Sequence, residues 1–249
     1  MEVLPYSFPE LGKKREVALM FDNIARRYDF LNHLLSLNID RFWRRRAISH
    51  LRNRHPRHIL DVATGTGDFA VAALRLNPEK ITGIDLSGAM MEKGKQKILA
   101  KKLGDKIDFF GGDAEVLPFK DASFDAVLCG FGVRNFEDPG RGIREMYRVL
   151  KNSGQAVILE FSKPVRSPFR QIYNIYFSSI LPRIGKVVSG DPQAYRYLPE
   201  SVDAFPEGEQ FLEILRDSGF SECGKRTLTF GVATVYYGMK VQSSFSGTQ

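Results

Sequence analysis

Apolar runs alternate with helix-type patterns through the middle of the chain. Five short runs have the length and apolar character of buried strands: 58–62, 80–84, 107–110, 124–129 and 155–161. The stretches between them repeat apolar residues at helical spacing over 67–76, 88–103 and 140–150. Strands that alternate with helices predict a parallel sheet with helices on both faces.

The C-terminal part of the chain predicts a different connection. A helical pattern over 207–218 precedes two strand-like runs, 220–230 and 232–240. Only a glycine turn separates these two runs, so we expect them to pair antiparallel. The sequence therefore predicts an α/β fold in a single domain, 1–249, with a doubly wound, mostly parallel sheet of seven strands.

Two long segments lie outside this alternation. Residues 13–57 have apolar positions at helical spacing and predict a helical cap before the first strand. Residues 162–206 are rich in Pro, Tyr, Phe and Ile and show little strand character. Because so long a segment inside a compact domain is usually functional, we expect a helical or irregular insertion over a site. The tail, 241–249, is rich in Ser, Gly and Thr and is expected to fray.

Composition favours a soluble protein in a reducing compartment. Hydrophobic residues make up 43% of the chain and charged residues 26%, which is ordinary for a globular protein. Cys129 and Cys223 both stand in apolar runs, so we expect buried, reduced thiols rather than a disulfide framework or a metal site. The sequence shows neither a basic-then-apolar leader nor an apolar run that could span a bilayer. We therefore expect a cytoplasmic protein.

The net charge of +7 is concentrated in one stretch. Residues 41–57 contain seven arginines and no acidic residue. One interpretation is a solvated helix face whose buried stripe is Trp43, Ala47, Ile48 and Leu51. The alternative is attraction to an anionic surface, such as acidic lipid, nucleic acid or a phosphorylated ligand.

The turn Gly65-Thr66-Gly67 follows the first predicted strand, which itself carries one acid, Asp61. Eighteen residues after Gly67, the second predicted strand ends at Asp85. Glycines let a backbone approach a ligand closely, and a carboxylate at the tip of the second strand can hold a ribose diol. This pattern predicts a binding site for a cofactor that contains a nucleoside.

Two classes of cofactor fit this turn. With Ala70 in the last place, Gly65-x-Gly67-x-x-Ala70 satisfies the looser dinucleotide pattern, so an NAD(P)-dependent oxidoreductase stays an alternative. Three features favour another cofactor. They are Asp61 inside the first strand, a further acid at Asp113 after the third strand, and the antiparallel end of the sheet.

With these residues the chain resembles the class I S-adenosylmethionine-dependent methyltransferases, whose fold is Rossmann-like. The resemblance implies that the glycine turn approaches the methionine end of the cofactor, that Asp85 holds the ribose, and that Asp113 with Ala114 reaches the adenine. The residues that it places at the cofactor are Asp61, Gly65, Thr66, Gly67, Asp85, Asp113 and Ala114. Many members have glycine in place of Ala63, so the loop is expected to be more constrained here. The alternative is that Asp85 and Asp113 only cap the helices that follow them.

Four further blocks narrow the resemblance to the quinone C-methyltransferases of menaquinone and ubiquinone synthesis. They are 28–36 with Trp43-Arg44, 131–135, 148–151 with 159–164, and 195–201 with 205–206, and the resemblance covers 16–240. The chain departs from this family at Asp40, where histidine is usual, and at Asn152-Ser153. It also departs at Gly130, where some members have a serine that contacts the cofactor.

The resemblance implies methylation of a ring carbon on a polyprenylated quinol, with demethylmenaquinol as the leading substrate and a benzoquinol as the alternative. Because the methyl of a sulfonium is already activated, the enzyme mainly has to align a nucleophilic carbon with it. That carbon becomes nucleophilic when the neighbouring ring hydroxyl loses its proton. The site therefore needs a proton acceptor and a group that stabilises the developing phenolate.

Arg134 and Asn135 follow the fourth predicted strand, at the edge where open α/β sheets bind ligands. We predict that Arg134 stabilises the phenolate and that Asn135 donates or accepts a hydrogen bond that orients the substrate. The alternative for Arg134 is an ion pair with a nearby acid such as Glu137 or Asp138.

Tyr28 and Asp29 are candidates for proton transfer, since they end the helical region that could close over the cofactor. The alternative role for both is to hold the cap in place. His33 could also serve as a base, but a lone histidine in a helical leucine pattern is more often a packing residue.

The 162–206 insertion is the candidate channel or lid for the prenyl tail. Its apolar wall would be Phe169, Ile172, Tyr173, Ile175, Tyr176, Phe177, Ile180 and Leu181, and its basic side chains are Arg166, Arg170, Arg183 and Lys186. A substrate dissolved in a bilayer implies weak peripheral contact with the inner face of the membrane. The alternative is that the apolar stripe is ordinary core.

Other partners and functions are less favoured by the sequence. An RNA methyltransferase would use the basic stretch, but no RNA-binding module is recognisable and aromatic residues do not interleave with the arginines. We therefore expect no nucleic acid partner. A non-catalytic quinone- or lipid-binding protein with this fold stays an alternative, and a homodimer is compatible with the resemblance.

Overall fold

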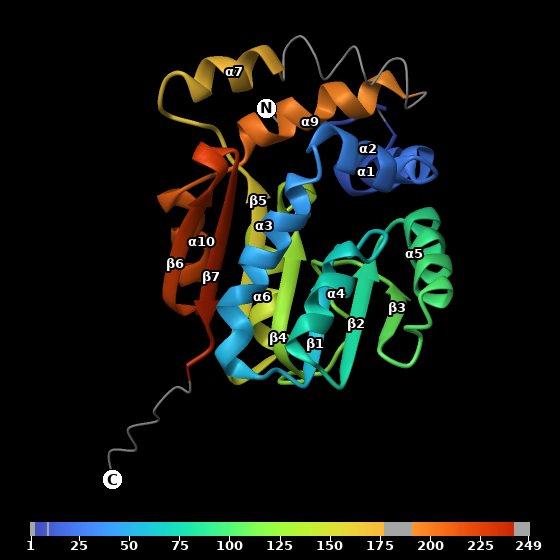
Figure 1. Cartoon of the computed structure of the whole chain (residues 1–249), viewed down its shortest axis with the longest axis vertical. Coiled ribbons are helices and arrows are strands. Elements are labelled where there is room, and N and C mark those ends of the chain that lie inside the picture. The colour runs from blue at the N-terminus through green and yellow to red at the C-terminus, as the bar shows by residue number, and fades with distance from the viewer. Residues whose placement is uncertain (1–2, 9, 177–190, 242–249) are drawn as a thin grey trace.

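The chain forms a seven-stranded sheet in the order β3-β2-β1-β4-β5-β7-β6, with helices packed on it (Figure 1). The computed structural model describes residues 3–8, 10–176 and 191–241. Strands β1 to β5 are parallel, whereas β7 is antiparallel to both β5 and β6. The predicted mostly parallel sheet with an antiparallel end is confirmed.

The strands lie close to the predicted positions. They are β1 His58–Val62, β2 Lys80–Asp85, β3 Ile107–Gly111, β4 Phe124–Gly130, β5 Leu150–Phe161, β6 Ser221–Leu228 and β7 Ala233–Met239. The main difference is β5, which begins at Leu150 rather than at 155, directly at the end of the preceding helix. Leu150 pairs with Phe124, and the β4–β5 register is irregular directly after this pair. The first residues of β5 therefore do not show the apolar pattern of a regular buried strand.

The helices divide into those of the sheet and those of the cap and insertion. Around the sheet are α4 Asp68–Ala73, α5 Gly88–Ala100, α6 Pro139–Val149 and α10 Glu209–Asp217. The N-terminal cap consists of α1 Lys13–Ile24, α2 Tyr28–Leu35 and α3 Ile39–Ile48, followed by the 3-10 turn Ser49–Arg54. The insertion contains α7 Phe169–Ile175 and α9 Pro192–Ala204.

Two buried clusters show that helices cover both faces of the sheet. One cluster packs α6 and α10 against β1, β4 and β5, with Met146 and Phe211 at its centre. The other packs α3, α4 and α5 against the opposite face, with Ala47 and Leu128 fully buried. Strand order reverses between β1 and β4, and open α/β sheets bind ligands outside the C-terminal strand ends at such a switch point.

Helices α1 and α2 of the cap lie with the insertion over the C-terminal ends of the strands, whereas α3 runs along a face of the sheet (Figure 1). Helix α1 packs on α9 through a cluster that includes Met20, Ile24, Tyr195 and Tyr197. No helix in the described ranges is long and apolar enough to cross a membrane. The two segments that the sequence set apart from the sheet therefore cover the edge at which a ligand would bind.

The basic stretch 41–57 forms a helix face, as one of the two interpretations predicted. Trp43, Ala47, Ile48 and Leu51 are all buried, and most of the arginines around them are exposed. Arg44 is the exception, because its side chain is buried beside acidic residues.

The two cysteines differ in their surroundings. Cys129 is fully buried on β4, as expected. Cys223 is only half-buried, so the expectation of two buried thiols was wrong for it. The reason is that β6 is the edge strand, and most of its side chains are exposed.

Candidate functional site

Two cavities lie under the cap, and three side chains line both of them: Phe21, Tyr28 and Phe131. The smaller cavity, of about 70 Å³, lies at the ends of β1, β2 and β3. The larger, of about 330 Å³, lies between the cap, the insertion and the end of β5. Because the two cavities share these side chains, ligands bound in them would meet there.

The glycine turn forms one wall of the smaller cavity, and its backbone explains its residues. Gly65 and Gly67 have positive φ angles of 55° and 81°, which glycine adopts at little cost. A Cβ on Gly67 would also come within 2.7 Å of the Phe109 ring. Ala63 has a φ of 53°, so the constraint expected from alanine at this place is present. Gly65 lines the cavity, whereas Thr66 and Gly67 are not among the residues that line it.

Asp85 lines the smaller cavity and connects the glycine turn to the segment that follows β2. Its carboxylate accepts hydrogen bonds from the Gly65 N–H at 2.7 Å and from the Ser87 N–H at 2.8 Å. Burial raises the pKa of Asp85, against the lowering effect of these backbone donors. The Leu86 backbone also acts on this carboxylate, and because a carboxylate has about four acceptor positions, it can still accept from a ribose hydroxyl.

Asp61 lies beneath the turn and does not line either cavity. It is fully buried, and one of its oxygens accepts from the Thr64 hydroxyl at 2.7 Å and from the Ala70 N–H at 3.0 Å. Its other oxygen is buried without a hydrogen-bond partner. Among the residues that the resemblance placed at the cofactor, Asp61 therefore has the geometry of a support for the turn.

The far end of the smaller cavity contains Asp113 and Ala114, and Asp113 is already paired. Lys14 of α1 contacts the Asp113 carboxylate at 2.6 Å and the Glu115 carboxylate at 3.3 Å. A cavity of about 70 Å³ is also smaller than ordinary ligand sites, which start at about 300 Å³. We infer that α1 moves and that Lys14 leaves Asp113 when a nucleoside binds.

We expect Lys14→Met to bind S-adenosylmethionine about two- to fivefold more tightly, because the partly exposed Lys14–Asp113 pair no longer has to be broken. Isothermal titration calorimetry measures the change, with Lys93→Met on the exposed face of α5 as the matched control. Weaker binding by Lys14→Met would instead mean that the ammonium contacts the cofactor.

The remaining donors and acceptors of the smaller cavity fit S-adenosylmethionine. The Asn135 Oδ1 atom is buried without a hydrogen-bond partner, although its amide nitrogen donates to the Phe131 carbonyl at 3.3 Å. It is an acceptor available for a cationic or amino donor. Gly130 also lines this cavity, and a Cβ there would lie 2.8 Å from the Phe69 ring. The serine of some relatives would therefore require Phe69 to move.

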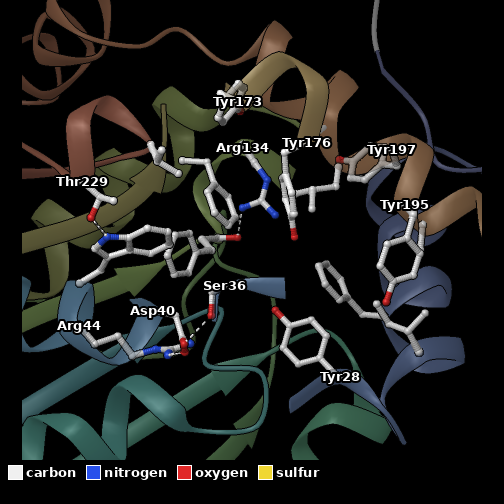
Figure 2. A pocket seen from close by; sticks show the side chains of 18 of the residues that line it. Tyr28, Ser36, Asp40, Arg44, Arg134, Tyr173, Tyr176, Tyr195, Tyr197 and Thr229 are labelled. Carbon is white, nitrogen blue, oxygen red and sulfur yellow. Dashed lines mark hydrogen bonds and ion pairs between the residues drawn. The ribbon is translucent and has the colours of Figure 1, made fainter. Parts of the chain in front are cut away.

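The larger cavity has mainly aromatic walls (Figure 2). It is lined by Met20, Phe21, Ile24, Tyr28, Ser36, Asp40, Trp43, Arg44, Phe131, Arg134, Phe161, Phe169, Ile172, Tyr173, Tyr176, Ala194, Tyr195, Tyr197, Leu198, Thr229, Phe230 and Val232. Trp43 is held by a hydrogen bond from its indole N–H to the Thr229 hydroxyl at 2.7 Å. These walls suit a flat ring, and the polar side chains are placed at separate points around it (Figure 2).

Arg134 reaches into the larger cavity, and its acidic partner lies on the next strand. The guanidinium contacts the fully buried Glu160 carboxylate at 2.9 Å and lies 5.3 Å from the centre of the Phe161 ring. The predicted alternatives, Glu137 and Asp138, are not the partners. Burial raises the pKa of Glu160, although Arg134 acts to lower it. The Arg134 Nε atom is buried without an acceptor, so the guanidinium retains a donor.

The two candidates at the start of α2 have different surroundings. Tyr28 lines both cavities. Asp29 lines neither, and its carboxylate accepts from the Thr66 hydroxyl and contacts the Lys97 ammonium, each at 2.5 Å. This geometry matches the alternative in which Asp29 holds the cap on the glycine turn.

A group of polar residues that the sequence did not single out as a site lies at the edge of the larger cavity. Ser36 and Asp40 line it, and Asp40 contacts both His33 and Arg44. One signal was available, since Asp40 stands where the resemblance leads one to expect histidine. Its partners were harder to foresee, because Ser36 and His33 lie in a leucine-rich helical pattern.

The insertion supplies part of the wall of the larger cavity. Phe169, Ile172, Tyr173 and Tyr176 line the larger cavity, whereas Ile175 is exposed and does not. Arg166 and Arg170 are exposed beside them. The other predicted wall and basic residues lie outside the described residues: Phe177, Ile180, Leu181, Arg183 and Lys186. The predicted fraying of 242–249 lies outside them too.

Solved structures share this fold. A possible histamine N-methyltransferase from Thermotoga maritima superposes with a TM-score of 0.62 at 21% identity, covering 89% of this chain and 99% of the other. A putative S-adenosylmethionine-dependent methyltransferase from Methanococcus maripaludis gives 0.61 at 19% identity, covering 96% and 99%. At such identities the likeness shows the fold alone.

Sequence comparisons identify the family. A demethylmenaquinone methyltransferase of Bacteroides fragilis is 48% identical over 96% of this chain and 98% of its own length. A demethylmenaquinone methyltransferase of Deinococcus radiodurans is 48% identical over 93% and 97%. A ubiquinone/menaquinone biosynthesis C-methyltransferase of Geotalea daltonii is 46% identical over 94% of this chain and its own full length.

The family model described as the ubiE/COQ5 methyltransferase family matches residues 10–240. This match decides between the two cofactor classes that the glycine turn allowed, against the oxidoreductase. The chain belongs to the ubiE/COQ5 methyltransferase family and is an S-adenosylmethionine-dependent methyltransferase.

Proposed function

We propose that this enzyme methylates a ring carbon of demethylmenaquinol, using S-adenosylmethionine bound in the smaller cavity. The observation that carries the proposal is the aromatic cavity of about 330 Å³ that meets the cofactor site at Phe21, Tyr28 and Phe131. Two relatives at 48% identity are named demethylmenaquinone methyltransferases, which supports the naphthoquinol over other rings. A benzoquinol is the second candidate, since the Geotalea relative's name includes both pathways.

S-adenosylmethionine supplies a methyl group that is already activated by its positively charged sulfur. The protein has to exclude water, align the ring carbon and stabilise the oxygen that loses its proton. Arg134 is our candidate for the last role, because it lines the larger cavity and its position is fixed by Glu160 and the Phe131 carbonyl. Asn135 would accept a hydrogen bond from the cofactor, and Asp29 would hold the cap closed.

The test is a reaction with a reduced, short-tailed demethylmenaquinol and S-adenosylmethionine labelled in its methyl group. We expect label in the ring methyl of menaquinol and one S-adenosylhomocysteine for each product. A parallel reaction with the corresponding demethylated benzoquinol measures the preference between the rings as a ratio of kcat/KM. Label transfer to the benzoquinol alone would overturn the assignment of the substrate, and transfer to neither would overturn the function.

We further propose that the larger cavity opens toward a membrane at α7. Ile172 and Phe230 line the cavity, yet 60% and 68% of their surfaces are exposed, so the cavity reaches the surface between them. The Phe169 ring stacks on Phe230 at 3.8 Å, which makes this opening apolar. A prenyl tail leaving the ring would pass it, and the exposed Arg166 favours anionic headgroups.

Ile172→Asp should reduce co-sedimentation with anionic vesicles severalfold, because it places a charge at this opening. Leu99→Asp is the matched control, since Leu99 is equally apolar and exposed but lies on α5. Binding that is unchanged by Ile172→Asp, or that is equal for anionic and neutral vesicles, would contradict membrane contact at α7.

A further inference from the structure

Asp40 is the one carboxylate among the described residues that line the larger cavity. It lies on the first turn of α3, and only 3% of its surface is exposed. A buried charge needs compensating partners, and those of Asp40 come from both ends of the α2–α3 connection. Figure 2 shows it beside Ser36 and Arg44, across the cavity from Tyr173.

Each oxygen of Asp40 has a defined partner. One accepts a hydrogen bond from the Ser36 hydroxyl at 2.7 Å. The other lies 2.9 Å from the His33 Nδ1 atom and also contacts the Arg44 guanidinium. Burial acts to raise the pKa of Asp40, but Ser36, Arg44 and His33 together outweigh it and hold that pKa below its usual value. The carboxylate is therefore ionised at neutral pH and can accept a proton.

The net charge of the residues around Asp40 allows this group to take up one more proton. His33 Nε2 and Arg44 both lie within 4 Å of Asp68, which in turn contacts Lys97 at 2.8 Å. The cluster combines three carboxylates with two permanent cations: Asp29, Asp40 and Asp68 with Arg44 and Lys97. Apart from His33, the cluster has an excess of one negative charge, and one added proton makes it neutral.

We propose that Ser36 and Asp40 form the proton acceptor of the methylation, a role that rests on the function proposed above. The ring O–H bond breaks as its proton moves to the Ser36 oxygen, while the Ser36 proton moves to Asp40. The electron pair left on the ring oxygen makes the neighbouring carbon nucleophilic toward the methyl group. When that carbon loses its hydrogen to water and the ring becomes aromatic again, Asp40 returns its proton through Ser36 to the ring oxygen. One proton is released overall.

Asp29 cannot take this role from its observed position. Its carboxylate is held by Thr66 and Lys97, and it does not line the larger cavity. Glu160 is also close to the cavity, but it is fully buried and its charge is matched by Arg134. Asp40 differs from both because Ser36 connects it to the cavity space.

The test compares two substrates that differ in the acidity of the ring hydroxyl. One is a short-tailed demethylmenaquinol, and the other is a halogenated analogue whose hydroxyl is mostly ionised at the assay pH. A general base contributes about 10²- to 10⁴-fold to a rate, so Asp40→Asn should lower kcat by that amount with the first substrate. With the ionised analogue we expect a loss of less than about tenfold, because no proton has to be removed. Ser36→Ala should show the same dependence on acidity with a smaller loss.

Asp125→Asn is the control, since its carboxylate pairs with Lys151 and belongs neither to this cluster nor to the cavity lining. Its effect, whatever its size, should be the same for both substrates. Equal losses for both substrates in Asp40→Asn, or a loss below threefold, would overturn the relay. If Asp40→Asn does not fold, Ser36→Ala decides by the same criterion. Failure of the proposed function is distinguishable, because the wild-type enzyme would then methylate neither substrate.

Discussion

Arg134→Met should lower kcat for the quinol by about 10²- to 10³-fold while the affinity for S-adenosylmethionine stays within about twofold. The guanidinium lines the larger cavity, so a developing negative charge on a ring oxygen would gain a fixed cation there. Arg134 does not line the smaller cavity, which is why cofactor affinity should change little. Single-turnover kinetics with saturating cofactor, together with calorimetric binding of the cofactor, measure both quantities.

This variant also removes the partner of a buried charge, so stability and catalysis have to be separated. Glu160 is fully buried, and leaving it unpaired should cost about 3–5 kcal/mol of unfolding free energy. The double variant Arg134→Met/Glu160→Gln removes both charges and should recover most of that stability. It should still lack the activity. Recovery of kcat to within threefold of the wild type in the double variant would show that Arg134 acts only through the fold.

A surface control excludes a general effect of losing an arginine. Arg216→Met breaks an exposed pair with Glu209 on α10, far from both cavities. Solvent screens an exposed pair of this kind, so neither kcat nor the unfolding free energy should change measurably.

The strands of the sheet and the helices packed on it were predictable, because the apolar residues of each element repeat with a clear periodicity. Their apolar residues pack on two helical layers, so strands appear as apolar runs and helices as stripes at helical spacing. Asp85 and Asp113 were predictable as well, because parallel strands bring their C-terminal ends to one edge of the sheet.

The polar partners of the site could not be predicted in the same way, because they come from different layers. The alternative role for Arg134 was an ion pair with an acid close in sequence, but β4 and β5 are neighbours and place Glu160 beside it. Asp29 was an open choice between base and support until Thr66 and Lys97, from two other elements, were seen to hold it. Such contacts depend on how the cap docks on the sheet, and no local period encodes that docking.

A buried carboxylate beneath the glycine turn should make the unfolding free energy fall as pH rises. Burial raises the pKa of Asp61 to about 7, whereas an unfolded aspartate has a pKa of about 3.9. Between these values the folded state keeps a proton that the unfolded state has lost, so stability falls as pH rises through this range. Because one pKa unit corresponds to about 1.36 kcal/mol, the unfolding free energy should fall by about 4 kcal/mol in total across this range.

Asp61→Asn removes this titration and keeps a side-chain oxygen that can accept from Thr64 and Ala70. The unfolding free energy of the variant, relative to the wild type, should therefore increase between pH 4 and pH 7 and stay constant above about pH 8. Urea titrations at pH 5, 6, 7 and 8, without cofactor, measure the difference. The variant is expected to overtake the wild type within this range, because only the wild-type carboxylate has to ionise in a fully buried place.

Asp125→Asn is the matched control, because it is the same substitution at an aspartate whose pKa is shifted in the opposite direction. Burial acts to raise the pKa of Asp125, but Lys151 and the backbone N–H groups of Arg57 and His58 outweigh it and lower that pKa. Its contribution to stability is therefore complete above about pH 4 and is lost only at lower pH, so this variant should differ from the wild type by a constant amount between pH 5 and 8. If Asp61→Asn gave an equally flat difference, Asp61 would be ionised in the folded protein throughout this range. The group beneath the glycine turn would then be a charged carboxylate. The free-energy cost of burying that charge would have to be offset by the hydrogen bonds from Thr64 and Ala70 alone.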